Sequence, residues 1–348
     1  MEYGLFYQLP SWAEQDRKTR YDETIEQIVL GDQLGYDVAW LAEMHFQPEY
    51  SVMPSPIVVG AAAAALTKRI RLGTGVILLP LHDPLRAAED AATLDIISNG
   101  RLEYGIGRGG RPAHYYGFGI PVEDRDERFT EGLDVLLRAW ADEPLNFHGK
   151  HFNYDDVNVT PKPLQRPHPR LRIAANSEDS LDRAARMGIP IMITPITNTR
   201  EDLIERCHSY RRIRKEIGNP ATPDDIAVLF PLFVHETGQT ARDQMEESMM
   251  RYIRIIAQTM LAGYMHHGTD PTQIPPLGLR LNTITYPEVL DSMCIAGDPD
   301  QVLAGIQQAQ TDYGTGQVMC WFNPGGLVPH TQVSTTMRLF MQQVAPRL

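Results

Sequence analysis

Arg108 lies among Gly107, Gly109 and Gly110 in a stretch that reads RLEYGIGRGGR over residues 101–111. Apolar and polar residues alternate in the first half of the stretch, which predicts a strand that ends just before Arg108. The glycines leave backbone N–H groups unshielded by side chains, and a guanidinium can donate two parallel hydrogen bonds to an oxyanion. These residue types and their spacing predict an anion-binding site built from Arg108, Gly109 and Gly110.

Two other interpretations of this stretch compete with an anion site. Gly105, Gly107 and Gly110 match the G-x-G-x-x-G fingerprint of dinucleotide-binding folds. That fold needs a helix directly after the glycines and an acidic residue at the end of the next strand, whereas residues 114–119 (HYYGFG) predict an aromatic loop. A glycine turn that carries a surface arginine is the simpler structural alternative. Evidence from other segments of the chain is needed to choose among these three interpretations.

A second set of reactive side chains follows a short apolar segment at residues 37–42 (DVAWLA). Glu43 and His45 stand two residues apart at the end of this predicted strand, and both residue types transfer protons in active sites. Glu43 is either a general base or the partner that orients His45. His45 is either the catalytic acid or base, or a packed histidine at a strand end. His82 precedes the helix start Asp83–Pro84 and is expected to be structural.

Strands and helices alternate along the chain. This alternation places Arg108 at the end of one predicted strand and Glu43 and His45 at the end of another. Eight strands are predicted, at residues 3–9, 37–42, 69–79, 102–106, 171–175, 190–194, 227–235 and 318–322. Alternating strands and helices give a parallel sheet, and eight such strands close into a (β/α)8 TIM barrel, an α/β fold. No linker or low-complexity segment divides the chain, so residues 1–348 are expected to form one domain.

Two segments depart from this alternation of strands and helices. Residues 147–169 are rich in proline and aromatic residues and predict an extended connection. Residues 257–293 show no clear periodicity and predict an irregular insertion after the seventh helix, either a mobile lid near the site or a disordered excursion. The helix before Ser98 is predicted to bury Ala88, Ala92 and Ile96.

Charge and cysteine content limit the possible partners and cofactors. The formal net charge is −12, from 32 basic and 44 acidic residues, and no basic tract is present. This balance argues against nucleic-acid and membrane partners. Three cysteines share no metal-ligand spacing and His266–His267 lacks a nearby carboxylate framework, so no metal site is predicted. The first residues lack a signal-peptide pattern and no apolar run reaches membrane length, which predicts a cytoplasmic protein.

Several stretches, in this order and spacing, resemble the bacterial luciferase-like family of flavin-dependent monooxygenases. The resemblance implies a (β/α)8 barrel that binds flavin mononucleotide (FMN) at the C-terminal ends of its strands. It covers most of the chain, although each matching stretch is modest alone. The stretches are residues 37–46, 67–85, 89–110, 149–169, 172–188, 296–302 and 314–322.

The resemblance also implies roles for individual residues. In the family, the flavin phosphate is held by an arginine after the fourth strand, here Arg108, and by the start of the helix after the fifth strand. Such a helix start offers free N–H groups and the positive end of the helix dipole, although simple helix capping would also explain a serine there. The implied residues at that start are Asn176, Ser177 and Ser180, and those next to the flavin ring are Thr194 and Gly75–Val76, the position of a non-prolyl cis peptide.

Two departures from the family pattern bear on catalysis. Met44 stands where luciferase carries its catalytic histidine, and a thioether cannot transfer a proton. Gly107 replaces the reactive cysteine of luciferase. His45 and Glu43 are therefore the catalytic candidates, and light emission is not expected.

The function implied by the resemblance is a flavin-dependent monooxygenase. It would take reduced FMN from a separate flavin reductase and use dioxygen to oxygenate a small organic substrate. A homodimer is implied as well, because the family pairs through its second and third helices and the alanine run 61–65 would allow close helix contact. The alternatives are a hydride-transfer oxidoreductase that uses the deazaflavin coenzyme on the same barrel, and a flavin-binding protein without catalysis.

Overall fold

Eight parallel strands close into a barrel in the computed structural model, which describes residues 1–11, 16–265 and 276–348. Each strand pairs with the next along the chain, β12 pairs back to β1, and the predicted (β/α)8 barrel is thereby confirmed. A short segment, β4 (Ile77–Leu78), extends the pairing of β3 with β5. The barrel strands are β1 (Glu2–Tyr7), β2 (Val38–Leu41), β3 (Arg71–Thr74), β5 (Leu102–Gly107), β8 (Arg170–Ala174), β9 (Ile191–Ile193), β10 (Ile226–Val234) and β12 (Gln317–Trp321).

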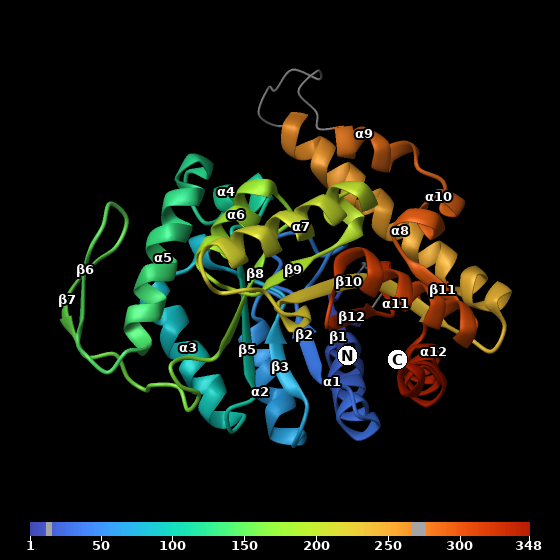
Figure 1. Cartoon of the computed structure of the whole chain (residues 1–348), viewed down its shortest axis with the longest axis horizontal. Helices are drawn as coiled ribbons and strands as arrows, with labels where there is room; N and C mark the ends of the chain where they lie inside the picture. The colour runs from blue at the N-terminus through green and yellow to red at the C-terminus, as the bar shows by residue number, and fades with distance from the viewer. Residues whose placement is uncertain (12–15, 266–275) are drawn as a thin grey trace.

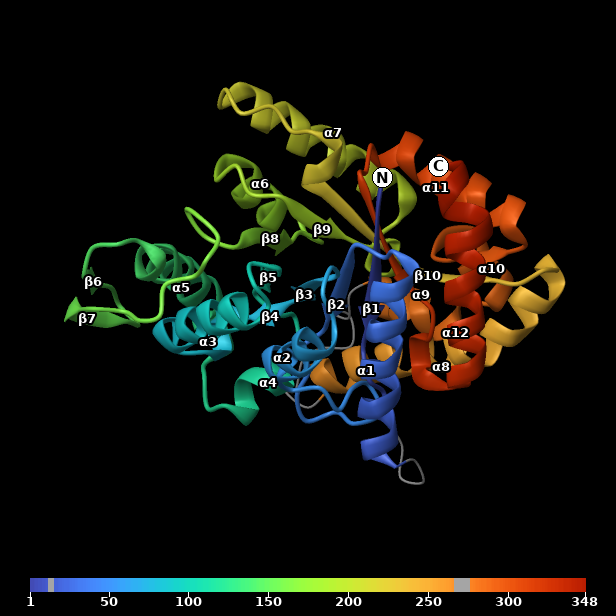
Figure 2. The ribbon, with the colours of Figure 1, turned by 90° about the horizontal axis from the view of Figure 1, so that it is seen from below.

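Helices return the chain between the strands and surround the barrel (Figures 1 and 2). Their starts follow ordinary capping chemistry: the Asp83 carboxylate accepts hydrogen bonds from the Leu85 and Arg86 N–H groups at the first turn of α3. Among the described residues, no helix has the length and apolar character needed to span a membrane. The main helices are α1 (Arg17–Leu34), α2 (Pro56–Leu66), α3 (Pro84–Ile97), α5 (Arg125–Trp140), α6 (Glu178–Arg186), α7 (Arg200–Glu216), α8 (Gly238–Met265), α11 (Pro299–Tyr313) and α12 (His330–Leu339).

A buried ion-pair network occupies the N-terminal ends of the barrel strands. Glu103 and Arg172 are almost fully buried, and Arg172 Nε lies 2.5 Å from Glu103 Oε1. Arg71 Nε lies 3.5 Å from the other Glu103 oxygen, and its Nη2 lies 2.5 Å from Glu2. Buried charges persist only when they are paired in this way. The network fills this end of the barrel and leaves the C-terminal strand ends for a site.

Three local predictions need correction. Residues 112–117 form a short helix, α4 (Pro112–Gly117), where an aromatic loop was expected, because Pro112 sits at the first helical position, where proline is favoured. The extended connection contains an antiparallel hairpin of β6 (Leu145–His148) and β7 (Asn153–Val157), which stands out from the barrel beside α5 (Figures 1 and 2). Ile96 is 40% exposed, although Ala88 and Ala92 are buried as predicted.

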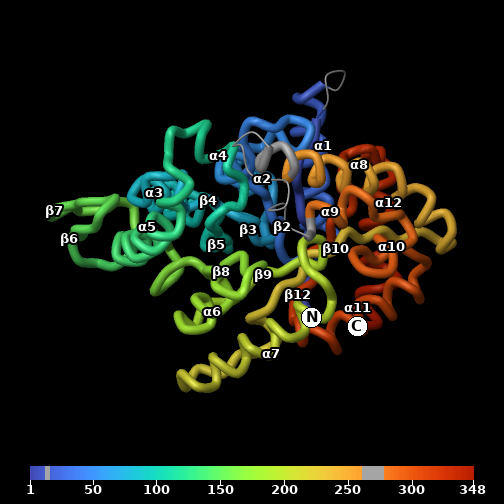
Figure 3. The backbone as a smooth tube through the Cα atoms, turned by 90° about the horizontal axis from the view of Figure 1, so that it is seen from above, coloured from blue at the N-terminus to red at the C-terminus, as the bar shows by residue number. Residues whose placement is uncertain are grey.

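The described part of residues 257–293 is helical and not irregular. It comprises the end of α8, α9 (Pro276–Thr283) and α10 (Tyr286–Ser292), after which β11 (Ile295–Gly297) pairs with β10. Residues 266–275, including His266–His267, lie outside the described residues. α9 lies at the same end of the barrel as α4, and the view from above shows both there (Figures 1 and 3). A lid role for this segment stays a prediction.

Candidate active site

Arg108 lies just after the C-terminal end of β5, and its guanidinium points to the start of α6. Arg108 Nη2 donates to the Ser177 hydroxyl at 3.0 Å, across 69 residues of sequence. The loop is fixed by the Tyr115 hydroxyl of α4, which donates to the Arg108 carbonyl. A Cβ built on Gly110 would meet nothing within 4 Å, so this backbone borders open space. The structure therefore brings the predicted cation and hydroxyl together beside accessible backbone.

The opening of α6 is a capping box. The Ser177 hydroxyl accepts from the Ser180 N–H at 3.3 Å, and the Ser180 hydroxyl accepts from the Ser177 N–H at 3.2 Å. The preceding Asn176 accepts from the Thr194 N–H at 3.2 Å, which joins the ends of β8 and β9. Helix capping thus explains why both residues are serines. It does not explain the contact of Ser177 with Arg108, which is a separate observation.

Two carboxylates share the Arg108 guanidinium. Arg108 Nη1 lies 2.8 Å from Asp179 of α6 and also forms an ion pair with Asp126 of α5. Partial burial alone would raise the pKa of the Asp126 carboxyl, but its pairing with Arg108 and with Arg125 lowers that pKa. Asp179, beside the proposed anion site, is thus paired with the same cation.

The Gly75–Val76 peptide bond is cis, as predicted. It lies beside the end of β5, because β4 follows it directly and Leu78 pairs with Gly107. A Cβ built on Gly107 would lie 2.7 Å from Val76 Cγ2, closer than real Cβ atoms approach. This contact gives a steric reason for glycine at the position where luciferase has its reactive cysteine.

Glu43 is held between two histidines. Its Oε1 accepts hydrogen bonds from His45 Nε2 at 2.7 Å and from His82 Nε2 at 2.8 Å, while Oε2 accepts from the Leu78 N–H at 3.0 Å. Glu43 is only 2% exposed. His82, expected to be structural, thus belongs to the same hydrogen-bonded group as the two catalytic candidates.

Burial and hydrogen bonding act against each other in this group. Burial alone would raise the Glu43 pKa, but the hydrogen bonds from His45 and His82 lower it below its ordinary value. For His82, burial alone would lower the pKa, and the Glu43 carboxylate outweighs it and raises the pKa. The arrangement favours a carboxylate paired with a protonated His82.

Aromatic side chains cover His45. The His114 ring packs edge-on against it at 5.6 Å, and Phe118 does so at 4.9 Å. Burial and the nearby Arg111 lower the His114 pKa to about 4, so His114 is neutral at pH 7. Phe46 and Phe118 are themselves half exposed, at 58% and 45%. Met44 is buried in the hydrophobic core.

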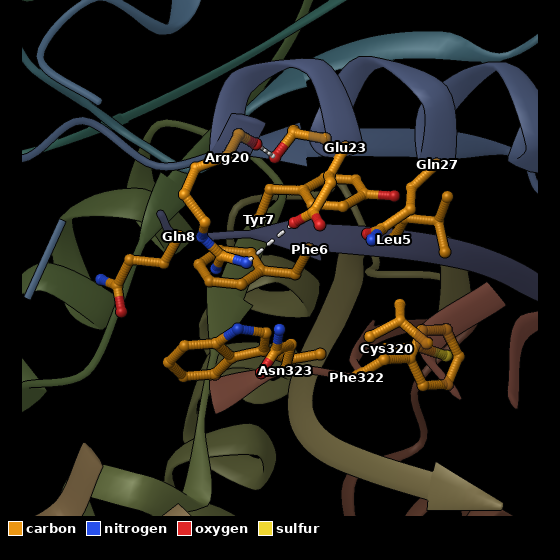
Figure 4. Close-up of a pocket in the computed structure, with 13 residues that line it drawn as sticks. Leu5, Phe6, Tyr7, Gln8, Arg20, Glu23, Gln27, Cys320, Phe322 and Asn323 are labelled. Atoms are coloured by element: carbon orange, nitrogen blue, oxygen red, sulfur yellow. Dashed lines mark hydrogen bonds and ion pairs between the residues drawn. The ribbon is translucent and has the colours of Figure 1, made fainter. Parts of the chain in front are cut away.

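A small cavity lies elsewhere, between α1 and the ends of β1 and β12 (Figure 4). Its lining includes Tyr7, Arg20 and Asn323, and Arg20 pairs with Glu23 at 3.3 Å. Its volume of about 20 Å³ suits roughly one or two water molecules. None of the predicted site residues lines it, and it is far too small for a flavin ring.

The family model described as luciferase-like monooxygenase matches residues 1–316 of the chain. The chain belongs to the luciferase-like monooxygenase family. The predicted enzyme class, an oxidoreductase of the luciferase-like type, is thereby confirmed at the level of the family.

Curated relatives match either part or all of this family member. The oxygenase component of the flavin-dependent trigonelline monooxygenase of Acinetobacter baylyi is 31% identical over 199 residues, which cover 56% of this chain and 55% of that protein. The alkanal monooxygenase alpha chain of the Kryptophanaron alfredi symbiont is 24% identical over 358 residues, 100% of this chain and 98% of that one. The chain spans about half the length of the first curated relatives that it matches.

Solved structures share the fold over the full chain. Monooxygenase RslO1 of Streptomyces bottropensis superposes with a TM-score of 0.86 at 28% identity, covering 100% of this chain and 99% of that one. The oxygenating constituent of 3,6-diketocamphane monooxygenase of Pseudomonas putida, in complex with FMN, gives 0.82 at 22% identity over 100% and 99%. The coenzyme F420-dependent tetrahydromethanopterin reductase of Methanopyrus kandleri gives 0.75 at 20% identity over 99% of each chain. The last two support the fold alone.

Sequence reasoning did not assign two residues to this site. His82 reaches Glu43 across 39 residues and Asp126 reaches Arg108 across 18, and no local pattern signals such contacts. His114, from the segment expected to be a loop, lies in α4.

One group of described residues has metal-like spacing, namely Asp124, Glu127 and His151. Lys150 Nζ lies 2.5 Å from Glu127 and 3.8 Å from Asp124. The lysine already balances the charge of this exposed group, so the group gives no reason to assign a metal.

Proposed function

We propose that this protein is a flavin-dependent monooxygenase that receives reduced FMN from a separate reductase and uses dioxygen to oxygenate a small organic substrate. The observation that carries the proposal is the meeting of Arg108 with the serine cap of α6 at the C-terminal strand ends, where barrel enzymes hold their ligands. The oxygenase component named for the Acinetobacter relative supports the reductase partner.

The residues present fit a phosphate group. Arg108 can donate two hydrogen bonds to phosphate oxygens, and the start of α6 adds hydroxyls and backbone N–H groups at the positive end of a helix dipole. Arg108, Asn176, Ser177 and Ser180 would hold the phosphate, and Gly75, Val76 and Thr194 would line the flavin ring. When bound, reduced flavin supplies the electrons that activate dioxygen.

The proposed proton chemistry involves Glu43 and the two histidines that donate hydrogen bonds to it, His45 and His82. We assign to His45 Nδ1, the ring nitrogen that does not contact Glu43, the transfer of a proton to or from the substrate, and to Glu43 the fixing of the His45 tautomer and orientation through Nε2. His82 shares the Glu43 charge. The rings of Phe46 and Phe118 limit the access of water to His45.

A second candidate is hydride transfer with the deazaflavin coenzyme, since an F420-dependent reductase shares the fold. The longer phosphodiester tail of that coenzyme would require further cations near Arg108. Arg111, the nearest in sequence, lies over the Tyr50 ring at 3.9 Å and donates to Gln47 at 3.2 Å. Arg111 is therefore not available as such a cation. Arg125 and Arg183 lie near Arg108, and each is 3.6 Å from an aspartate that pairs with Arg108.

We also propose a homodimer formed through α2 and α3. α2 buries Val59 and Ala63 against the barrel but leaves Val58 67% and Leu66 61% exposed, and Ile97 at the end of α3 is 52% exposed. Apolar side chains gathered on two packed helices are typical of a protein–protein interface. Light scattering at micromolar concentration should give twice the chain mass of 39.2 kDa, and a monodisperse monomer would contradict the dimer.

Turnover tests the proposed function. The protein is mixed with a flavin reductase, NADH, FMN and a panel of small organic compounds under ¹⁸O₂, and products are analysed by mass spectrometry. A product that contains one ¹⁸O atom supports the monooxygenase. In a parallel assay with the reduced deazaflavin coenzyme in place of FMN, oxidation of that coenzyme without oxygen incorporation would identify the second candidate. Flavin binding without product from any compound would favour the non-catalytic alternative.

A further inference from the structure

The cation predicted to bind an anion already has two anionic partners. Arg108 Nη1 donates to Asp126 and, at 2.8 Å, to Asp179. The Arg108 side chain is 17% exposed, whereas those of Asp126 and Asp179 are 48% and 64% exposed. Both carboxylates therefore reach Arg108 from the solvent side, and a phosphate that approaches Arg108 has to compete with them.

Each carboxylate has a second arginine within reach. Asp126 Oδ2 lies 3.6 Å from Arg125 Nη2, and Asp179 Oδ2 lies 3.6 Å from Arg183 Nη2. Arg125 Nε is buried and has no hydrogen-bond partner among the described residues. A small rotation of either aspartate side chain would exchange one charged partner for another, without leaving a carboxylate unpaired.

We infer that Asp126 and Asp179 are exchangeable counter-ions of Arg108, which move to Arg125 and Arg183 when the flavin phosphate binds. This inference rests on the proposed function, because it takes Arg108 as the phosphate ligand. The three arginines exceed the two aspartates by one positive charge, so the cluster can accept a phosphate with little net charge. Without the exchange, the phosphate would meet a guanidinium that is already neutralised and two carboxylates that repel it.

The exchange makes the two aspartates affect flavins that carry a phosphate and no others. Riboflavin has no group that competes for Arg108, so it leaves both ion pairs intact and its affinity does not depend on the aspartates. FMN displaces both carboxylates, and its affinity is reduced by the free energy needed to do so. Asp126 and Asp179 thus set how far the proposed cofactor site prefers FMN over riboflavin, and both lower that preference.

Titration with oxidised FMN and with riboflavin, followed by flavin fluorescence, tests this role in Asp126→Asn and Asp179→Asn. Each variant should bind FMN about tenfold more tightly, the equivalent of one charge-assisted hydrogen bond, with riboflavin unchanged. Asp134→Asn and Asp182→Asn are matched controls, because they remove a carboxylate from the same helices that pairs with Arg138 and Arg186. Unchanged or weaker FMN binding in both site variants overturns the inference.

A double-mutant cycle tests whether Asp126 pairs with Arg125 when the phosphate binds. Arg125→Gln should weaken FMN binding in the wild-type background and have no effect when Asp126→Asn is present. Equal weakening in both backgrounds would mean that Arg125 binds the phosphate itself, which overturns the exchange. Arg108→Ala distinguishes a failure of the proposed phosphate site from a failure of the counter-ion exchange. If this variant leaves FMN affinity unchanged, the phosphate site and the exchange are both wrong. If it weakens FMN while the aspartate variants do not tighten it, only the exchange fails.

Discussion

Glu43 is the residue on which the proposed proton chemistry depends. A single buried oxygen accepts hydrogen bonds from two imidazoles, so a change at either histidine alters the other through the shared charge. This coupling explains how a chain with methionine at position 44 retains an acid–base group at the end of β2. The group uses a histidine from the segment after β4 in addition to His45.

Replacing His82 by asparagine should alter the pH dependence of the reaction. The Glu43 pKa is lowered in part by the hydrogen bond from His82, so its loss raises that pKa and moves the acid limb of the kcat/KM profile to higher pH. We expect a loss of roughly tenfold at pH 7, less than the ~10²–10⁴ typical of a direct acid or base. A profile identical to wild type would contradict the coupling.

Glu43 and His82 make the free energy of unfolding depend on pH, and their contributions are lost at opposite ends of the pH range. The Glu43 pKa is lowered in the folded state, so its contribution is present above the unfolded pKa and is lost as the pH falls through the folded value. The His82 pKa is raised, so its contribution is complete below the unfolded pKa and is lost as the pH rises through the folded value. Glu43→Gln should remove both dependences from a series of urea unfolding curves.

Gly107 should tolerate no side chain without cost. Gly107→Ala places a Cβ 2.7 Å from Val76 Cγ2, and overpacking of this kind costs about 1–3 kcal/mol. Gly110→Ala is the matched control, because its Cβ meets open space and should change the free energy of unfolding by less than ~0.5 kcal/mol. Equal stability of the two variants would show that the contact relaxes freely.

The start of α6 combines a structural and a binding role, and two helix caps separate them. Ser177→Ala removes an N-cap, which costs about 1 kcal/mol of unfolding free energy, and it should also weaken FMN binding. Thr199→Ala removes the corresponding cap of α7, where the hydroxyl accepts from the Asp202 N–H at 3.2 Å. This control should lose similar stability with no change in FMN affinity. If both variants bind FMN as the wild type does, Ser177 is only a cap.

Elements that are specified locally were predictable from the sequence, and those that depend on distant contacts were not. The eight strands and the start of α6 carry their own apolar patterns and caps. The β6–β7 hairpin is held partly by Glu131 of α5, which accepts N–H bonds from Lys150 and His151, and the 145–157 sequence does not show this. In the same way, Arg108 was proposed from a local signal and Ser177 from the family resemblance, whereas the contacts of Asp126 and His82 arise only from tertiary packing.

At the scale of the whole molecule, the two ends of the barrel have different tasks. The N-terminal ends are filled by buried ion pairs around Glu103, and the C-terminal ends carry the proposed cofactor site and the Glu43 group. Substitutions at the first end should therefore change stability, and those at the second end should change binding and turnover. This division is the usual one for a (β/α)8 barrel.

Glu103→Ala should be strongly destabilising. It leaves Arg172, which is 2% exposed, without its charged partner, and breaking a buried pair costs about 3–5 kcal/mol. Glu89→Ala is a control on α3, where a surface pair with Arg86 is worth at most about 1 kcal/mol. Urea unfolding followed by circular dichroism measures both. A loss at Glu103 no larger than at Glu89 would mean that the network contributes little.

The most direct test of the central claim is an anaerobic titration with reduced FMN and reduced riboflavin, comparing wild type with Arg108→Ala. Arg138→Ala, which removes an exposed arginine from α5, serves as the control. We predict that Arg108→Ala weakens reduced FMN by about 2–3 kcal/mol, roughly 30- to 150-fold. Riboflavin affinity and the control should be unchanged. Equal binding of reduced FMN by wild type and Arg108→Ala would contradict the phosphate site at the end of β5, and with it the proposed function.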